Sequence, residues 1–174
     1  DPQNHPFATP SGKIEIFSKR LYDMHHPEIP ALSHYVPAHE GPQDPLSERY
    51  PLQLITWKGK NRANSTQYAN PWLQEVQTQT LWINPLDAQP RGLTSGDTVR
   101  IHNDRGLCQV EVEVTPRIIP GVVAMQAGAW WQPDEQGIDR GGCANVLSSA
   151  RITALAKGNS HQTMLVEVTK HESV

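Results

Sequence analysis

The sequence has few cysteines, no excess of positive charge and no long hydrophobic run. Its two cysteines, Cys108 and Cys143, form no C-x-x-C pair and have neither zinc nor iron–sulfur spacing. The formal net charge of −3 does not favour a nucleic-acid binder. No stretch approaches the ~18 apolar residues of a membrane span. We expect a soluble globular protein with two buried free thiols, because free cysteine packs as a small hydrophobe; a disulfide is the alternative.

Proline is unevenly distributed, with nine of the fifteen prolines in residues 1–51. Each proline fixes φ and removes a backbone donor, so regular structure is expected to be sparse there. We therefore predict an extended Pro-rich arm over residues 1–45 and a compact domain over residues 46–174. The chain begins at Asp1 without a methionine or a signal-like stretch, which favours a fragment or a processed product.

Alternation of apolar and polar residues predicts six short strands. A further short strand is expected at the start of residues 13–24, followed by a short helix. The six strands are expected at residues 51–57, 80–85, 98–103, 107–115, 121–126 and 163–169.

Turn and cap signals separate these strands. Asn70-Pro71 and Asn84-Pro85 each predict the start of a short helix, and Gly92 can provide a left-handed exit from the second. The "NDRG" turn predicts a hairpin in which Gly106 supplies a positive φ. In the strand that follows, the residues expected to face inward are Cys108, Val110, Val112 and Val114.

Short strands, short helices and many turns indicate a β-barrel or a β-sandwich with small helical insertions. Residues 127–150 are rich in Gly, Trp and Asp and predict a long functional loop. These patterns alone leave the topology open.

Five segments in this order resemble the C-terminal part of the dimethyl sulfoxide reductase family of molybdenum oxidoreductases. They are "FATPSGKIEIFS" (7–18), "PLQLIT" (51–56), "WINPLDAQPRGLTSGDTVRIHNDRG" (82–106), "VTPRIIPGVVAMQAGAW" (114–130) and "GGCANVLSS" (141–149). The resemblance implies a mainly β fold, a six-stranded double-psi β-barrel with short helices, preceded by an irregular Pro-rich arm.

The resemblance also implies a cofactor and partners. The barrel would help to hold molybdenum bis(molybdopterin guanine dinucleotide), shared with missing domains that carry the metal ligand and any cluster cysteines. The whole bacterial enzyme would reduce S- or N-oxides such as dimethyl sulfoxide in anaerobic respiration, and this chain alone would be inactive. Its partners would be the preceding domains, an iron–sulfur electron-transfer subunit and a membrane anchor subunit, with no nucleic acid. The enzyme would be associated with the inner membrane, on the periplasmic side or alternatively in the cytoplasm.

The loop "TWKGKNRANST" (56–66) carries hydroxyls, amides and cations. A pterin dinucleotide needs amide-type partners for its pterin edges, and N–H groups and cations for its diphosphate. The resemblance assigns cofactor contacts in this loop, although "WKGKNR" replaces the Gly-Arg and the His of relatives. A solvated basic loop is the alternative. The residues assigned are Thr56, Trp57, Lys58, Asn61, Arg62 and Ser65.

Three residues outside this loop complete the predicted cofactor site: Trp130, Asn145 and Gln162, with His161 a weaker candidate. Their alternatives are core or interface packing for Trp130, a turn or cap role for Asn145, and an exposed loop position for Gln162. We expect Trp72 and Trp82 in the core, and neither a catalytic residue nor a metal ligand in this chain. The alternative functions are a non-catalytic double-psi barrel for protein contacts and a barrel hydrolase, which needs two facing carboxylates.

Overall fold

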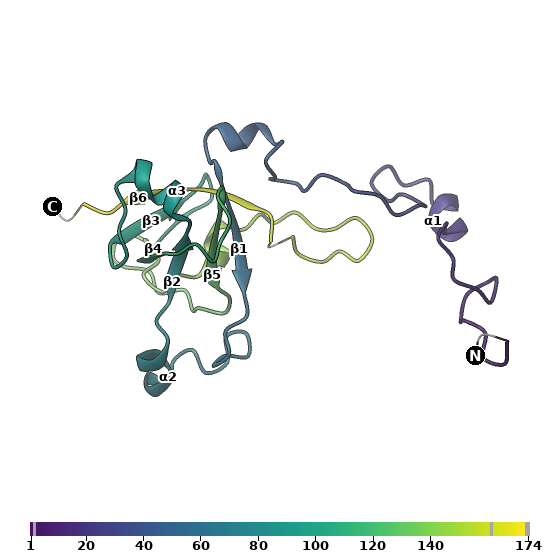
Figure 1. Cartoon of the computed structure of the whole chain (residues 1–174), viewed down its shortest axis with the longest axis horizontal. Helices are drawn as coiled ribbons and strands as arrows, with labels where there is room; N and C mark the ends of the chain where they lie inside the picture. The colour runs from purple at the N-terminus through teal and green to yellow at the C-terminus, as the bar shows by residue number, and fades with distance from the viewer. Residues whose placement is uncertain (2, 161, 173–174) are drawn as a thin grey trace. The chain divides into compact units, whose positions relative to one another are not determined.

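Six strands close into a barrel in the computed structural model, which describes residues 1, 3–160 and 162–172. The strand order around the barrel is β1-β5-β2-β4-β3-β6 (Figure 1). This arrangement confirms the predicted mainly β, six-stranded barrel. The strands are β1 (Leu52–Trp57), β2 (Thr80–Ile83), β3 (Thr98–His102), β4 (Leu107–Val114), β5 (Val122–Gln126) and β6 (Met164–Lys170).

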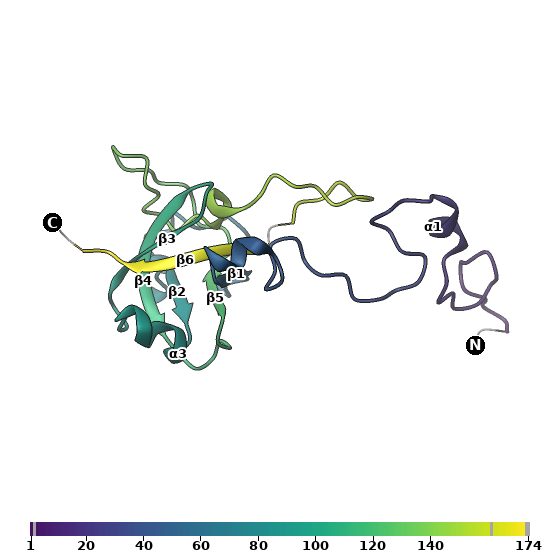
Figure 2. The same ribbon diagram turned by 90° about the horizontal axis from the view of Figure 1, so that it is seen from above.

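The pairing of the strands brings distant segments to one end of the barrel. Strands β1 and β5 are parallel, with Trp57 opposite Gln126, and β2 and β4 are also parallel. Strand β6 closes the barrel by pairing antiparallel with β1 and with β3 (Figure 2). The ends of β1, β5 and β3 therefore lie with the starts of β2, β4 and β6 at one opening, which we call mouth A.

The barrel interior is filled by apolar side chains that alternate along the strands. Cys108, Val110 and Val112 are buried as predicted, whereas Val114 is only partly buried. On the outer face of the same strand, Gln109 is also buried, because a loop covers this part of β4. The backbone N–H of Gln109 donates to the Asp139 carbonyl oxygen of that loop at 2.8 Å. Both thiols are free and buried, as predicted.

The two Asn-Pro signals start helices as predicted. Helix α2 (Pro71–Val76) is capped by the side chain of Asn70, and α3 (Pro85–Ala88) by that of Asn84. Helix α3 continues into the 3₁₀ helix η2 (Gln89–Arg91), which ends at Gly92 with a φ of 62°. Because α2 precedes β2 and α3 follows it, the two helices lie at opposite ends of the barrel, with α2 at mouth A (Figure 1).

Two local predictions were wrong. The expected strand at residues 13–16 does not form, since only one isolated bridge, Phe17–Leu32, precedes α1 (Lys19–Asp23) and no sheet lies beside it among the described residues. Gly106 does not have a positive φ. A Cβ at Gly106 would lie 2.7 Å from the Val146 carbonyl oxygen, so glycine is needed there for close packing of the 3₁₀ helix η3 (Ala144–Leu147).

Contacts divide the chain into two units. The barrel unit contains residues 38–151 and 159 onward, and the arm unit contains residues 1–37 and 152–158. Residues 38–45, which we expected in the arm, group with the barrel, as does the 3₁₀ helix η1 (Pro45–Glu48). Glu40 is one residue that holds this segment to the barrel, because its buried carboxylate binds both terminal nitrogens of Arg105 at 2.7 and 2.8 Å. Among the described residues, no helix has the length and apolar character needed to cross a membrane.

Candidate functional site

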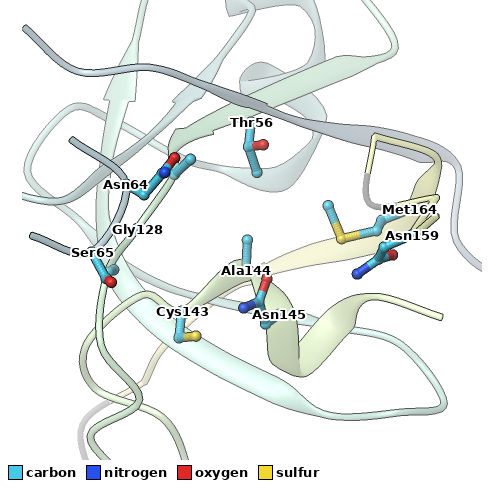
Figure 3. Close-up of a pocket in the computed structure, with 11 residues that line it drawn as sticks. Thr56, Asn64, Ser65, Gly128, Cys143, Ala144, Asn145, Asn159 and Met164 are labelled. Carbon is cyan, nitrogen blue, oxygen red and sulfur yellow. The ribbon is translucent and has the colours of Figure 1, made fainter. Parts of the chain in front are cut away.

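A pocket of about 260 Å³ opens at mouth A. Its walls come from four parts of the barrel unit: the end of β1 and its loop, the loop after β5, the region of η3, and the start of β6 (Figure 3). Distant segments of the sequence therefore build one site. The lining residues are Thr56, Asn64, Ser65, Ala127, Gly128, Ala129, Cys143, Ala144, Asn145, Asn159 and Met164.

The side-chain amide of Gln162 binds Thr56 near the end of β1. Its Oε1 accepts a hydrogen bond from the Thr56 backbone N–H at 2.8 Å. Its Nε2 donates to the Thr56 carbonyl oxygen at 3.2 Å and to Oγ1 of Thr56 at 2.7 Å. The Gln162 amide is therefore engaged within the protein, and it orients the Thr56 hydroxyl that lines the pocket.

Asn145 lies on η3, across the pocket from Thr56 (Figure 3). Within the described part of the chain, its carboxamide makes no hydrogen bond, and the residue is exposed. A carboxamide offers both donors and an acceptor. Asn145 can therefore bind a ligand edge that presents the complementary pair of groups.

Two residues of the 56–66 loop organise the loop itself. The amide of Asn61 donates to the Leu73 carbonyl oxygen at 3.3 Å, and its oxygen accepts from Nε2 of Gln126 at 3.2 Å. The Lys58 ammonium contacts the side-chain oxygen of Asn64. These contacts shape the wall that Asn64 and Ser65 contribute, and neither Asn61 nor Lys58 lines the pocket.

Arg62 does not line the pocket. Its guanidinium donates to Oε1 of Gln79 at 2.9 Å and lies 5.0 Å from the centre of the Tyr68 ring. Burial lowers the pKa of Arg62, because the charged form loses water. In the described chain no carboxylate pairs with it.

The predicted tryptophans also lie outside the pocket lining. Trp57 stacks on Trp82 with ring centres 5.0 Å apart, and Arg117 lies 4.3 Å from the Trp82 ring. The expectation that Trp82 lies in the core is therefore wrong, because this side chain is only half-buried and has the Arg117 cation over its ring. Trp130 donates from Nε1 to the Ser65 carbonyl oxygen at 3.0 Å, which supports one pocket wall. The expected burial of Trp72 is wrong, since 77 % of that residue is exposed on α2.

The structure adds lining residues that sequence reasoning did not assign to the site, among them Cys143, Asn159 and Met164. Cys143 stands two residues before Asn145 in the quoted "GGCANVL" motif, so proximity was an available signal. Burial raises the pKa of the Cys143 thiol, and the nearby charge of Asp139 adds to that increase. Asn159 and Met164 flank Gln162 but carry no distinctive pattern. His161 lies outside the described residues.

Three of the predicted residues, Thr56, Ser65 and Asn145, therefore line one pocket, and Gln162 binds Thr56 directly. Four more surround it: Lys58 and Asn61 shape the loop, Trp130 supports a wall, and Trp57 ends β1 on the outer face. Arg62 lies beside the neighbouring Gln79 and Tyr68. A mouth lined by hydroxyls, amides and small apolar side chains suits a polar, flat ligand.

Comparison with known proteins agrees with this class of site. The family described as "Molydopterin dinucleotide binding domain" matches residues 52–165, and the chain belongs to this family. The chain is similar to dimethyl sulfoxide reductase DmsA of Escherichia coli, with 50 % identity over 98 % of this chain and 22 % of that protein. It is also similar to the dimethyl sulfoxide/trimethylamine N-oxide reductase of Cereibacter sphaeroides, with 35 % identity over 98 % and 22 %, respectively.

A solved structure supports the fold. Acetylene hydratase from Pelobacter acetylenicus superposes with a TM-score of 0.76 at 20 % identity, over 98 % of this chain and 25 % of the hydratase chain. The resemblance to the dimethyl sulfoxide reductase family is confirmed by these relatives. The chain spans about a fifth of the length of these relatives, 22 % in each of the two reductases.

Proposed function

We propose that the pocket at mouth A binds the pterin part of a molybdopterin guanine dinucleotide. Family membership supports a molybdopterin dinucleotide as the ligand. The single observation that carries the proposal is the unpaired Asn145 carboxamide facing Thr56 across a pocket built from four segments. A pterin edge combines donors and acceptors, which an amide and a hydroxyl satisfy together.

The residues present fit part of this group. Thr56, Ser65 and Asn145 supply polar atoms, and Ala129, Ala144 and Met164 supply an apolar wall for a flat ring. The volume of about 260 Å³ is below the ~300–1,000 Å³ of pockets that enclose a whole small ligand. This chain would therefore hold one side of the cofactor, and other domains would supply the rest of the site.

The predicted residues then fall into two roles. Thr56, Ser65 and Asn145 would contact the cofactor, while Gln162 would orient Thr56. Lys58 and Asn61 would shape the loop wall, and Trp130 would brace it. Direct contacts of Trp57 and Arg62 with the cofactor stay predictions. In this chain Trp57 stacks on Trp82, and Arg62 donates to Gln79.

In the whole protein we propose that the cofactor contains molybdenum with two such dinucleotides, and that it reduces S- or N-oxides such as dimethyl sulfoxide. When bound, the cofactor would supply the oxygen-atom and electron transfer, and this chain would bind and orient it. The proposed partners are the other domains of the same subunit, an iron–sulfur subunit and a membrane anchor. We propose association with the inner membrane, on the periplasmic side or alternatively in the cytoplasm.

Cofactor affinity of the 174-residue chain tests the proposal. Asn145→Ala should weaken binding of molybdopterin guanine dinucleotide about tenfold, the effect of losing roughly 1.4 kcal/mol of hydrogen bonding. Gln136→Ala is the matched control, because it removes an exposed carboxamide outside the pocket. The quantity measured is the dissociation constant, from the change in pterin fluorescence. Absence of binding by the unmodified chain would overturn the proposal and favour the protein-interaction barrel.

A further inference from the structure

Asp139 is a buried carboxylate without a countercharge. Its exposed fraction is 0 %, and in the described chain no lysine, arginine or histidine pairs with it. A buried carboxylate is costly unless hydrogen bonds compensate for the lost water. The hydrogen bonds that the Asp139 carboxylate accepts must therefore compensate for this cost.

The backbone of Asp139 belongs to the barrel wall. Its N–H donates to the Leu107 carbonyl oxygen at 3.3 Å, and its carbonyl oxygen accepts from the Gln109 N–H at 2.8 Å. These two residues flank Cys108 at the start of β4, at mouth A. The residue is thereby fixed relative to the strands.

The carboxylate of Asp139 accepts hydrogen bonds from both sides of the loop that covers β4. Its Oδ1 accepts from the backbone N–H of Gln132 at 2.8 Å and of Gly141 at 3.1 Å. Its Oδ2 accepts from the backbone N–H of Cys143 at 2.6 Å. Three donors converge on two oxygens, so an acceptor-only side chain is required.

The loop packs closely against its neighbours between Asp139 and Cys143. A Cβ at Gly141 would lie 2.1 Å from the Trp130 carbonyl oxygen. Gly142 has a φ of +72°, and a Cβ there would lie 2.6 Å from Cγ1 of Val110. The two glycines of the "GGCANVL" motif therefore allow the backbone to pack tightly against the barrel, which brings Cys143 to the carboxylate.

The other end of η3 is also fixed. The Leu147 carbonyl oxygen accepts from Nδ2 of Asn103 at 2.9 Å and from Nε of Arg105 at 2.8 Å. The Leu147 side chain is fully buried. Asn145 thus stands between two anchored points, Cys143 and Leu147, which fix the backbone from which its carboxamide projects.

We propose that Asp139 is a positioning residue, whose carboxylate fixes Cys143 and thereby holds the Asn145 carboxamide at the pocket wall. The inference rests on the proposed function for its purpose, but the anchoring itself can be tested without the cofactor. Hydrogen bonds to a charged acceptor are stronger than neutral ones. An isosteric asparagine would present a donor to at least one backbone N–H, which would release Cys143 or the Gln132–Gly141 side of the loop.

Thiol labelling of the 174-residue chain separates anchoring from general stability. In Asp139→Asn, the rate constant of the Cys143 thiolate with iodoacetamide should rise about tenfold, as expected for loss of about 1.4 kcal/mol of local hydrogen bonding. This constant is taken from the pH dependence of labelling, which separates it from the change in thiolate fraction caused by losing the Asp139 charge. Cys108, which is fully buried inside the barrel, should keep its rate. Unchanged labelling of Cys143, or an equal increase at both cysteines, would overturn the positioning role.

Asp134→Asn is the matched control in the same loop. Asp134 also accepts from two backbone N–H groups, those of Gln136 and Ile138, both at 2.9 Å. It pairs with Arg140, and among the described residues no hydrogen bond joins its carboxylate to Cys143. Its substitution should therefore leave the Cys143 labelling rate within twofold of the unmodified chain. A tenfold increase in this control would attribute the effect to the loop in general and overturn the role of Asp139.

Two further measurements keep the inference testable if Asp139→Asn does not fold. In the unmodified chain, the Cys143 amide should exchange with deuterium as slowly as the β4 amides; rapid exchange would overturn the anchoring. Where Asp139→Asn folds, its affinity for molybdopterin guanine dinucleotide should fall about tenfold, and Asp134→Asn should match the unmodified chain. If the unmodified chain does not bind the cofactor, the proposed function fails, while labelling and exchange still decide whether Asp139 anchors Cys143.

Discussion

The barrel unit and the arm unit differ in what their apolar side chains contact. The barrel unit encloses one continuous core that includes side chains from all six strands. In the arm unit, no described residue is buried, although it carries eleven of the seventeen large apolar side chains that are exposed in the described chain. Burial of apolar area is the main favourable term in folding.

This difference indicates which parts can fold without help. The barrel pairs every strand on both sides and buries its own apolar surface, so it can offset the loss of chain entropy. The arm unit has one five-residue helix, α1, and no core. Its apolar side chains would be covered by the preceding domains that we propose for the whole protein.

The largest expected contrast between the two units is in hydrogen exchange. Amides in β1 and β5 should be protected at least ~1,000-fold, because they open only with the whole barrel. Amides of residues 1–37 should exchange within about tenfold of the unfolded rate, since little burial opposes their opening. Mass spectrometry of deuterated 174-residue chain measures both. Strong protection throughout residues 19–37 would break the comparison.

Removing the Glu40 charge should have the next largest effect, because this residue joins residues 38–45 to the barrel. Glu40→Gln leaves Arg105 without its buried partner and weakens the bond to the Leu165 N–H. The free energy of unfolding in urea should fall by about 3–5 kcal/mol. The control Glu113→Gln, which breaks the more exposed pair with Arg117, should cost about 1 kcal/mol or less. Equal losses would show that the segment is not anchored through Glu40.

A pair of isoleucines compares the two units directly. Ile83 in β2 is fully buried, whereas Ile16 in the arm unit is 78 % exposed. Ile83→Ala should lower the free energy of unfolding by about 2–5 kcal/mol, because it leaves a cavity in a packed core. Ile16→Ala should change it by no more than about 0.5 kcal/mol. Urea denaturation followed by circular dichroism measures both values, and a large loss with Ile16→Ala would contradict the account.

The smallest expected effect is on the pH dependence of barrel stability. Hydrogen bonds from Tyr50 and Arg49 hold the pKa of Asp104 below its ordinary value of 3.8. A lowered folded-state pKa stabilises the fold above pH 3.8, and that contribution is lost as the pH falls through the folded-state pKa. Asp104→Asn should therefore lower stability more at pH 7 than at pH 3. An identical loss at both values would show that the charge contributes nothing.

Much of the fold follows from local sequence patterns. The alternating runs predicted all six strands, and Asn70-Pro71 and Asn84-Pro85 marked both helix starts, because these signals act within a few residues. The wrong strand at residues 13–16 had the same alternation but finds no neighbouring strand to pair with in the described chain. Strand formation depends on a partner that a local pattern does not reveal.

The site was less predictable, because composition does not show which polar groups are already engaged. Asn61 and Asn145 carry the same carboxamide, and both were predicted to contact the cofactor. The Asn61 amide is hydrogen-bonded to Leu73 and Gln126, whereas Asn145 lines the pocket. The burial of Gln109 and the role that we propose for Asp139 depend on a loop that folds over β4 and lies far from it in the sequence. Only the three-dimensional arrangement brings such contacts together.

The central claim is that the hydroxyl and amide groups at mouth A bind a pterin cofactor. The most direct test is a titration of isotope-labelled chain with molybdopterin guanine dinucleotide, followed by nuclear magnetic resonance of backbone and side-chain amides. The account predicts that the largest shift changes occur at the Asn145 side-chain amide and at the backbone amides of Thr56 and Ser65. Shift changes confined to the α3 end of the barrel, or none at a saturating concentration, would contradict it.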